Sequence, residues 1–267
     1  MSAGEVLLDV SDIRLVLGGT LILEDLNFQV IDRVREGAVT GQVVGLLGPS
    51  GVGKTRLLRI IAGLDESDKG KVRGKDGAIL HAGSVGYVFQ DYPLLKHRTV
   101  EHNLVLAGRI GGMSHDAAKR RCKDLLETFK LSNRADFYPA QLSGGQRQRV
   151  AIAQQLMQPR QLLLMDEPFS GLDPLALTNV MSLIREVADL DELNTIVVVT
   201  HDIRAAMAAS DTLHMLGREP EKRDTSGAHI RWSYDMVERG LAWQKDVRDQ
   251  PAFVALSKEI EAKFAEL

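Results

Sequence analysis

The sequence lacks the features that mark secreted or membrane-spanning proteins. Cys122 is the only cysteine among 267 residues, so no disulfide can form within the chain. Its apolar runs, such as residues 43–47 and 196–199, are far shorter than the roughly 18–20 residues that a membrane-spanning helix needs. The chain begins without a basic segment followed by a long apolar stretch, so we expect no secretory signal. These absences predict a soluble protein of the cytosol.

The chain also has no large excess of charge of either sign. It contains 33 Lys and Arg against 36 Asp and Glu, which gives a formal net charge of −3. This balance argues against a chain built mainly to bind nucleic acid, so we expect no nucleic-acid partner. Hydrophobic residues make up 44% and charged residues 26%, which excludes wholesale disorder. The length suits one domain with an insertion, or two lobes.

The order of apolar patterns predicts an α/β fold. Continuous apolar strands alternate with amphipathic helices in the second half, which indicates a parallel sheet covered on both faces. Residues 71–90 are expected to form short strands, residues 99–158 to be mostly helical and residues 32–41 to form a hairpin tip. Strands are predicted at 6–10, 13–17, 21–31, 42–47, 162–165 and 195–199, and helices at 56–64, 116–130 and 174–188.

The last 50 or so residues are predicted to form a tail with a helix of its own. After Gly217 a charged stretch suggests an exposed linker. Pro251 suits the first turn of a helix. Apolar side chains recur at helical spacing after it, and we expect this stripe to pack on the body of the same chain. The stripe consists of Phe253, Leu256, Ile260 and Phe264.

The strongest single motif lies directly after the strand predicted at 42–47. Residues 48–55 fit G-x-x-x-x-G-K-[ST], with the expected strand before them and a helix after them. Glycines let successive backbone N–H groups converge on phosphate oxygens, and the helix N-terminus adds a favourable dipole. Lys54 would reach the β- and γ-phosphates, and the Thr55 hydroxyl would ligate Mg²⁺. The segment predicts a nucleotide-binding site.

Two adjacent carboxylates end the strand predicted at 162–165. Asp166 can hold Mg²⁺, directly or through water, beside the phosphate loop. Glu167 can take a proton from an attacking water molecule. Alone, the pair would be read as an acidic exit from a strand before Pro168. With a phosphate loop in the same chain, a functional pair is favoured.

A second possible anion site lies between these two motifs. Ser143 is a good N-cap, and the glycines after it leave backbone N–H groups open to an anion. In isolation, this would be an ordinary capped helix. However, the segment reads LSGGQ, downstream of a phosphate loop and upstream of LLLMDE, which resembles the ATP-binding subunits of ABC transporters.

Three further motifs match this family in order. Gln90, after Val-Phe, resembles the glutamine of the Q-loop. Residues 170–173 (SGLD) resemble the D-loop, and His201 resembles the switch histidine. The resemblance covers about residues 5–217, and the ordered set of motifs is highly specific.

The resemblance implies a P-loop NTPase fold with two lobes. A RecA-like α/β core with an antiparallel β subdomain would hold the phosphate loop and the carboxylates. An inserted helical subdomain, about residues 93–150, would carry LSGGQ. The ATPase domain would span 1–217, followed by the tail at 218–267.

In this family two subunits pack head to tail and bind ATP between the phosphate loop of one and LSGGQ of the other. His201 would contact the γ-phosphate, and Gln90 would sense Mg²⁺ and the attacking water. The cofactors expected are ATP and Mg²⁺. The implied catalytic residues are Glu167, His201 and Gln90; the metal ligands are Thr55, Gln90 and Asp166; and the nucleotide-binding residues are Gly48, Pro49, Ser50, Gly51, Val52, Gly53, Lys54, Thr55, Arg56, Ser143, Gly144, Gly145 and Gln146.

The sequence departs from the family pattern at four places. Leu17 stands where an aromatic residue usually stacks on adenine. Arg56 stands where a second hydroxyl residue is frequent, and Gln154 where an arginine is frequent. Residues 31–40 resemble an insertion in the second hairpin.

The resemblance implies an ATPase subunit that energises a membrane transporter. Residues 91–104 are similar to the segment of importers that meets the permease, and the nitrate, sulfonate and taurine importers are the nearest group. The implied partners are a second ATPase subunit, transmembrane permease subunits and, for an importer, a substrate-binding protein. The chain would then lie at the cytoplasmic face of the cell membrane. The alternative is an accessory ABC ATPase of lipid trafficking or iron–sulfur assembly. A chromosome-type ABC ATPase is disfavoured because no coiled coil separates the phosphate loop from LSGGQ.

Overall fold

The computed structural model describes residues 4–33, 41–190, 195–222, 225–242, 244 and 246–267. Most of the expected hairpin tip at 32–41 and of the insertion at 31–40 lies outside these residues. Within the described part of the chain, none of the helices has the length and apolar character that a bilayer crossing needs.

A six-stranded sheet forms the centre of the molecule, in the order β5-β6-β7-β3-β8-β9. All strands but the last run parallel, and β9 is antiparallel to β8. Every residue of β3, β6 and β7 is buried, as expected for a sheet with both faces covered. The strands are β3 (Gln42–Leu47), β5 (Gly86–Val88), β6 (Leu162–Asp166), β7 (Thr195–Thr200), β8 (Thr212–Gly217) and β9 (His229–Asp235).

The two faces of this sheet belong to different hydrophobic cores. Because side chains alternate along a strand, Val43 and Leu47 of β3 enter one core, and Val44 and Leu46 enter the other. The first core includes α5 (Pro174–Ala188) and α6 (Ile203–Ala209). The second includes α1 (Lys54–Ile61) and the antiparallel sheet. The predicted α/β architecture with both faces covered is confirmed.

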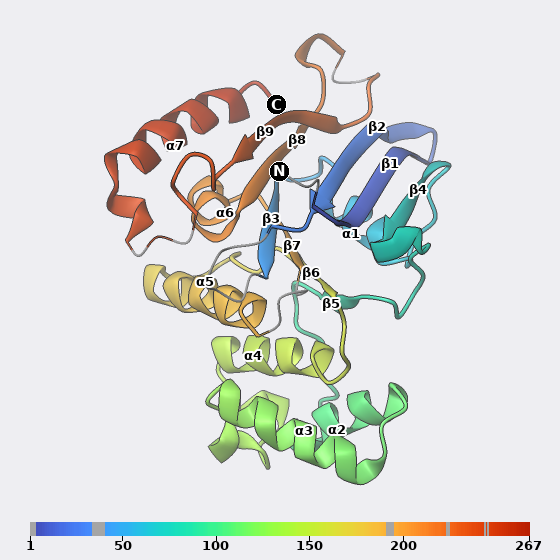
Figure 1. Ribbon diagram of the computed structural model, residues 1–267, viewed down its shortest axis with the longest axis vertical. Coiled ribbons are helices and arrows are strands. Elements are labelled where there is room, and N and C mark those ends of the chain that lie inside the picture. Colours follow the sequence, from blue (N-terminus) through green and yellow to red (C-terminus); the bar gives the residue numbers. More distant parts are fainter. Residues whose placement is uncertain (1–3, 34–40, 191–194, 223–224, 243, 245) are drawn as a thin grey trace.

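The antiparallel sheet has the order β2-β1-β4 (Figure 1) and consists of β1 (Val6–Leu17), β2 (Thr20–Ile31) and β4 (Lys69–Gly74). The expected turn at Gly18 and Gly19 joins β1 to β2, and both glycines have positive φ. The sequence predicts two strands before this turn, whereas the structure has one. The break between them is a bulge at Asp12, with φ 54°, whose backbone N–H donates to Asn27 Oδ1 at 2.8 Å.

A helical lobe occupies the lower end of Figure 1, inserted between β5 and β6. Its helices are α2 (Val100–Ile110), α3 (His115–Thr128) and α4 (Gly144–Gln155). Thr99, Ser114 and Ser143 cap their N-termini with side-chain oxygens. The predicted mixed fold, with helices inserted after the first parallel strands, is therefore present.

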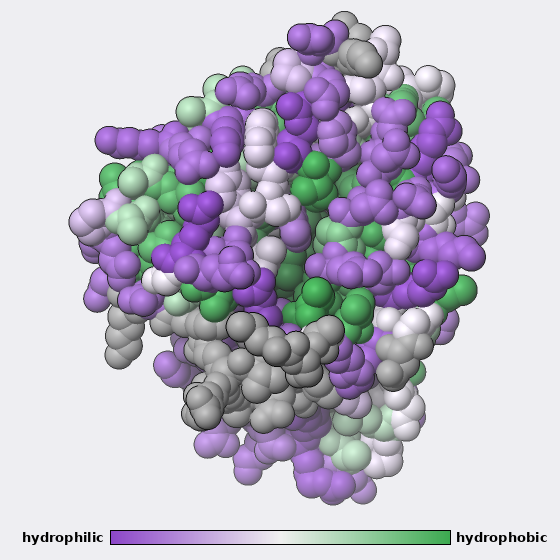
Figure 2. Space-filling view, turned by 45° about the horizontal axis from the view of Figure 1, so that its top comes forward, coloured by the Kyte–Doolittle hydropathy of each residue, from purple (hydrophilic) through white to green (hydrophobic). Residues whose placement is uncertain are grey.

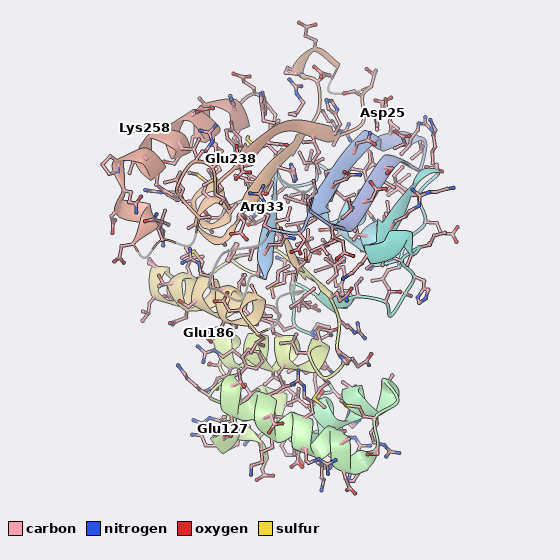
Figure 3. All side chains as sticks on the ribbon, viewed as in Figure 1. Asp25, Arg33, Glu127, Glu186, Glu238 and Lys258 are labelled. Atoms are coloured by element: carbon pink, nitrogen blue, oxygen red, sulfur yellow. The ribbon has the colours of Figure 1, made fainter. Side chains whose placement is uncertain are left out.

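The region after Gly217 differs from the sequence expectation. A linker and a later helix are predicted there, yet between them β9 adds an edge strand to the central sheet. Arg33 contacts this strand through Asp235, with 3.0 Å between Nη1 and Oδ1, and it lies close to Glu238 (Figure 3). The tail helix α7 (Pro251–Phe264) does dock on the body, because Phe253 and Ile260 are fully buried in the first core. That expectation is confirmed.

Candidate functional site

The phosphate loop joins β3 to α1, and its glycines are required by its backbone. Gly51 has φ 81° and Gly53 has φ 114°, in the left-handed region that glycine adopts without strain. A Cβ on Gly48 would lie 2.5 Å from the Leu216 carbonyl oxygen, so no side chain fits there. The Gly48 N–H donates to the Thr200 carbonyl at 3.2 Å, which anchors the loop to β7.

Lys54 lies at the centre of the loop and is almost fully buried. Its Nζ donates to the carbonyl oxygens of Gly48 at 2.8 Å and Pro49 at 3.1 Å, and lies 3.4 Å from Glu167 Oε1. Burial lowers the pKa of Lys54 below its usual value, although the neighbouring Glu167 and Asp166 oppose this shift. Among the described residues, Glu167 is the one anionic contact of the ammonium group. A phosphate oxygen would add a second charged partner.

Asp166, the last residue of β6, accepts hydrogen bonds at both carboxylate oxygens. Thr55 Oγ1 donates to Oδ1 at 3.0 Å, and the Tyr87 hydroxyl donates to Oδ2 at 3.2 Å. Burial raises the pKa of Asp166, while these hydrogen bonds lower it in part. A hydroxyl and a carboxylate at this separation are the hard oxygen donors that Mg²⁺ prefers. The described residues contain no cluster of three or more His, Cys, Asp or Glu side chains able to hold a metal.

Glu167 bridges Lys54 and His201. Its backbone has φ 48°, an unusual conformation for a residue with a side chain. The Glu167 N–H donates to the Val199 carbonyl at 2.9 Å, and Glu167 Oε2 lies 2.9 Å from His201 Nδ1. The strand ends β6 and β7 lie side by side in the sheet, which explains how residues 34 positions apart meet.

Gln90 lies at the same edge of the sheet but outside this cluster of side chains. Val88 of β5 pairs with Met165 of β6, so Gln90 and Glu167 each lie two residues beyond a paired position. The Gln90 side chain is exposed, and no hydrogen bond joins it to the described residues of the site. The structure therefore brings Lys54, Thr55, Asp166, Glu167 and His201 together and leaves Gln90 at the rim.

The LSGGQ segment forms a separate site at the start of α4. Ser143 Oγ accepts from the Gln146 N–H at 3.3 Å, and Gln146 Oε1 accepts from the Ser143 N–H at 3.0 Å. Gly144 and Gly145 are exposed, with open space where a Cβ would be. A groove of about 400 Å³ beside them is lined by residues of α4, by Asp173 and by residues of α5, not by the phosphate loop.

Two of the residues that depart from the family pattern lie near the loop. Leu17 lies at the tip of the first hairpin and is 40% exposed. The adjoining part of β2 contacts the phosphate loop, since a Cβ on Gly53 would come within 2.9 Å of Leu23. Arg56 is directed to Asp65, with 3.0 Å between Nη1 and Oδ2.

Three polar residues contact this region although no role at the site is predicted for them from the sequence: Tyr87, Gln148 and Tyr92. Each reaches the ends of β6 from an element distant in sequence. Gln148 is 1% exposed, which is unusual for an amide side chain. The one feature of the sequence that could have indicated a role for Gln148 is its position two residues after LSGGQ.

Comparisons with known proteins agree with the motifs. A protein-family profile described as ABC transporter matches residues 31–170. A sulfate/thiosulfate import ATP-binding protein CysA from Mesostigma viride is 39% identical over 191 residues, which is 70% of this chain and 55% of the relative. A probable CysA from Chlorella vulgaris is 41% identical over 194 residues, 71% of this chain and 82% of the relative. The chain spans a little over half the length of several such relatives.

Two solved structures share the fold. CbiO1 from Clostridium perfringens, described as part of the ABC transporter complex cbiONQ, has a TM-score of 0.74 at 22% identity and covers 96% of this chain and 99% of its own. The ATP-binding cassette MJ0796, a dimer in a post-hydrolysis state bound to ADP and Pi, has a TM-score of 0.67 at 27% identity. It covers 86% of this chain and 98% of its own.

Proposed function

The chain belongs to the ABC transporter family, and we propose that it is an ATP-hydrolysing subunit that energises a membrane importer. One observation carries the proposal: Lys54 of the phosphate loop lies 3.4 Å from Glu167, which lies 2.9 Å from His201. A phosphate-binding cation, a base and a histidine thus share one site. Relatives named as import ATP-binding proteins favour an importer over an accessory ATPase.

The proposed chemistry follows from the residues around this site. Backbone N–H groups of residues 50–55 and the Lys54 ammonium bind the β- and γ-phosphates of ATP. Thr55 and Asp166 hold Mg²⁺, which neutralises phosphate charge when bound. Glu167 accepts the proton of the attacking water. His201 orients the Glu167 carboxylate and contacts the γ-phosphate, and Gln90 enters from the rim when nucleotide is bound.

We propose that two copies form the complete site. The chain has two anion-binding helix starts, at α1 and α4, and in one copy they line different surfaces. Head-to-tail packing brings Ser143–Gln146 of one copy to the γ-phosphate held by the other. The dimeric state named for the MJ0796 structure supports this arrangement.

We further propose that a groove between the lobes receives the permease. It measures about 450 Å³ and is lined by Leu95, Leu106 and Ile110, which are 37%, 41% and 77% exposed. Such exposed apolar side chains in a groove are typical of a site for a partner's helix. This docking would hold the chain at the cytoplasmic face of the membrane. Sulfate and thiosulfate, named for the relatives, are the cargoes to assay first.

The base assignment is tested by Glu167→Gln. We expect ATP binding within about twofold of wild type and a fall in kcat of at least a hundredfold, because a general base contributes about 10²–10⁴. The variant should also accumulate an ATP-bound dimer, measured by light scattering. Lys54→Ala is the matched variant that should lose ATP binding at least tenfold. Normal turnover in Glu167→Gln would sink the assignment.

A further inference from the structure

The peptide that follows Glu167 is held from two sides by side chains of other elements. Gln148 Nε2 donates to the Pro168 carbonyl oxygen at 3.1 Å, and the Tyr92 hydroxyl donates to the same oxygen at 3.5 Å. Gln148 belongs to α4 and is 1% exposed. Tyr92 is two residues after Gln90 and is half-buried. The Pro168 carbonyl oxygen thus connects α4, the Q-loop segment and the turn after β6 that contains Glu167.

The Glu167 backbone needs such support. With φ 48°, Glu167 has a conformation that persists only where the surroundings fix it. On its N-terminal side, the Glu167 N–H is bonded to Val199 of the neighbouring strand. On its C-terminal side, the Ser170 N–H donates to the Glu167 carbonyl at 3.2 Å, and Pro168 is held by Gln148 and Tyr92. Loss of these donors would free the loop to change the direction of the carboxylate.

We propose that Gln148 and Tyr92 are positioning residues that set the Glu167 carboxylate for catalysis. The inference rests on the proposed function, because it takes Glu167 as the base and Ser143–Gln146 as a contact for ATP. Gln148 lies five residues after Ser143 in one rigid helix, about 7.5 Å along its axis. A shift of α4 that accompanies ATP contact therefore moves Gln148 relative to Pro168.

In the proposed dimer this geometry links the two ATP sites. The start of α4 contacts the nucleotide bound to the partner copy, whereas Gln148 acts on the base of its own copy. A hydrogen bond of 3.1 Å is lost by a small displacement, since such bonds weaken steeply with distance and angle. ATP at one site thereby aligns the base at the other. Tyr92 contacts the same oxygen from the Q-loop segment, so a movement of that segment also changes how Pro168 is held.

The first test uses the full chain and steady-state ATP hydrolysis. Gln148→Met keeps the length of the side chain and removes the donor, so kcat should fall about five- to tenfold with KM for ATP within twofold. Tyr92→Phe should have a smaller effect because its contact is longer. The double variant removes both donors and should lose more than the product of the two single losses. In the matched control Arg121→Met, a donor to the Leu156 carbonyl at the other end of α4 is removed, and kcat should stay within twofold.

A second variant covers the case in which Gln148→Met does not fold. Gln148→Glu keeps the side-chain shape but, when ionised, has no donor. Protonation of the new carboxyl group restores one. Its kcat relative to wild type should therefore rise from pH 8 to pH 6, and a ratio that is flat over this range counts against the proposal.

The decisive measurement repeats Gln148→Met in the Glu167→Gln background under single-turnover conditions. A positioning role predicts no further loss there, because the base is already absent. An equal fold-loss in both backgrounds would show a general structural defect and overturn the proposal, as would unchanged kcat in the double donor variant. If wild type fails to hydrolyse ATP, the proposed function itself fails. If Glu167→Gln hydrolyses ATP normally, the base assignment fails and this proposal fails with it.

Discussion

Glu167 has an unfavourable backbone conformation, and its carboxylate contacts both Lys54 and His201. A φ in the left-handed region costs roughly 1–2 kcal/mol for a residue with a Cβ. The same conformation turns the chain sharply from β6 toward α5. Strain of this kind is found where a side chain has to be aimed, so it independently marks the residue that the motif order selects.

Leu17 provides a test of base recognition at the residue scale. Leu17→Tyr should tighten ATP binding about three- to tenfold, because an aromatic ring at this exposed hairpin tip can stack on adenine. Isothermal titration with ATP measures the change. Tripolyphosphate, which has no base, serves as the control ligand and should bind wild type and variant equally. An equal gain in affinity for both ligands would mean that the ring at position 17 does not act by stacking on adenine.

His214 predicts a pH dependence of stability. Burial lowers its pKa to about 4 in the folded chain, where its neighbours are Ser233 and Phe28. The unfolded chain takes up the proton near pH 6.5, so the free energy of unfolding should fall as pH drops from about 6.5 to about 4. Between pH 7 and pH 5 the loss from this group should be about 2 kcal/mol.

The comparison for His214 is the variant His214→Asn, which has no titrating group. Urea unfolding at pH 7 and pH 5 measures both chains. All other titrating groups are the same in wild type and variant. The difference between the two pH profiles of the free energy of unfolding therefore reports on His214. Parallel profiles would contradict the assignment.

At the scale of elements, the sequence predicts those strands and helices that are determined by residues adjacent in the chain. The apolar run at 42–47 and the helix opened by Pro174 were placed to the residue, because a buried strand and a capped helix each leave a local signature. The strand β9 could not be predicted from the sequence, because an edge strand is half-exposed and alternates polar with aromatic residues. Tyr87 and Gln148 could not be found, since each acts on a partner 79 or 20 residues away.

The docking of α7 is a second test at this scale. Ile260→Ala should lower the free energy of unfolding by about 2–4 kcal/mol, because Ile260 is fully buried and its removal leaves a cavity. Lys258→Ala is the matched control on the same helix, where the side chain lies at the outer surface (Figure 3) and the change should be within about 0.5 kcal/mol. Urea titrations measure both. Equal effects would mean that the helix is not held by its apolar face.

At the scale of the whole molecule, polar and charged groups dominate the face shown in Figure 2, and hydrophobic residues reach the surface in small groups at its centre and toward its left side. The groove between the lobes is a separate apolar feature, formed by Leu95, Leu106 and Ile110. The central sheet presents the phosphate loop and the carboxylates at one edge, and the helical lobe projects beyond it (Figure 1). In the proposed complex, a chain of this form relays a change at the nucleotide to the permease docked in this groove.

Ile110→Ser tests that docking. With 77% of Ile110 exposed, the substitution should leave the unfolding midpoint unchanged and reduce recovery of permease subunits in a pull-down at least threefold. Ile79→Ser, which changes an isoleucine of 69% exposure outside the groove, is the matched control. Equal recovery with Ile110→Ser and wild type would argue that the permease binds elsewhere.

The two edges of the central sheet have a consequence for how the chain behaves when crowded. Unpaired backbone groups at a sheet edge can template strands from other molecules. Here one edge strand, β5, is only three residues long, and the other, β9, carries Arg231 and Asp235 in ion pairs. Short and charged edges are the usual defences against edge-to-edge pairing. The chain can therefore reach a high local concentration with little tendency to aggregate through its sheet.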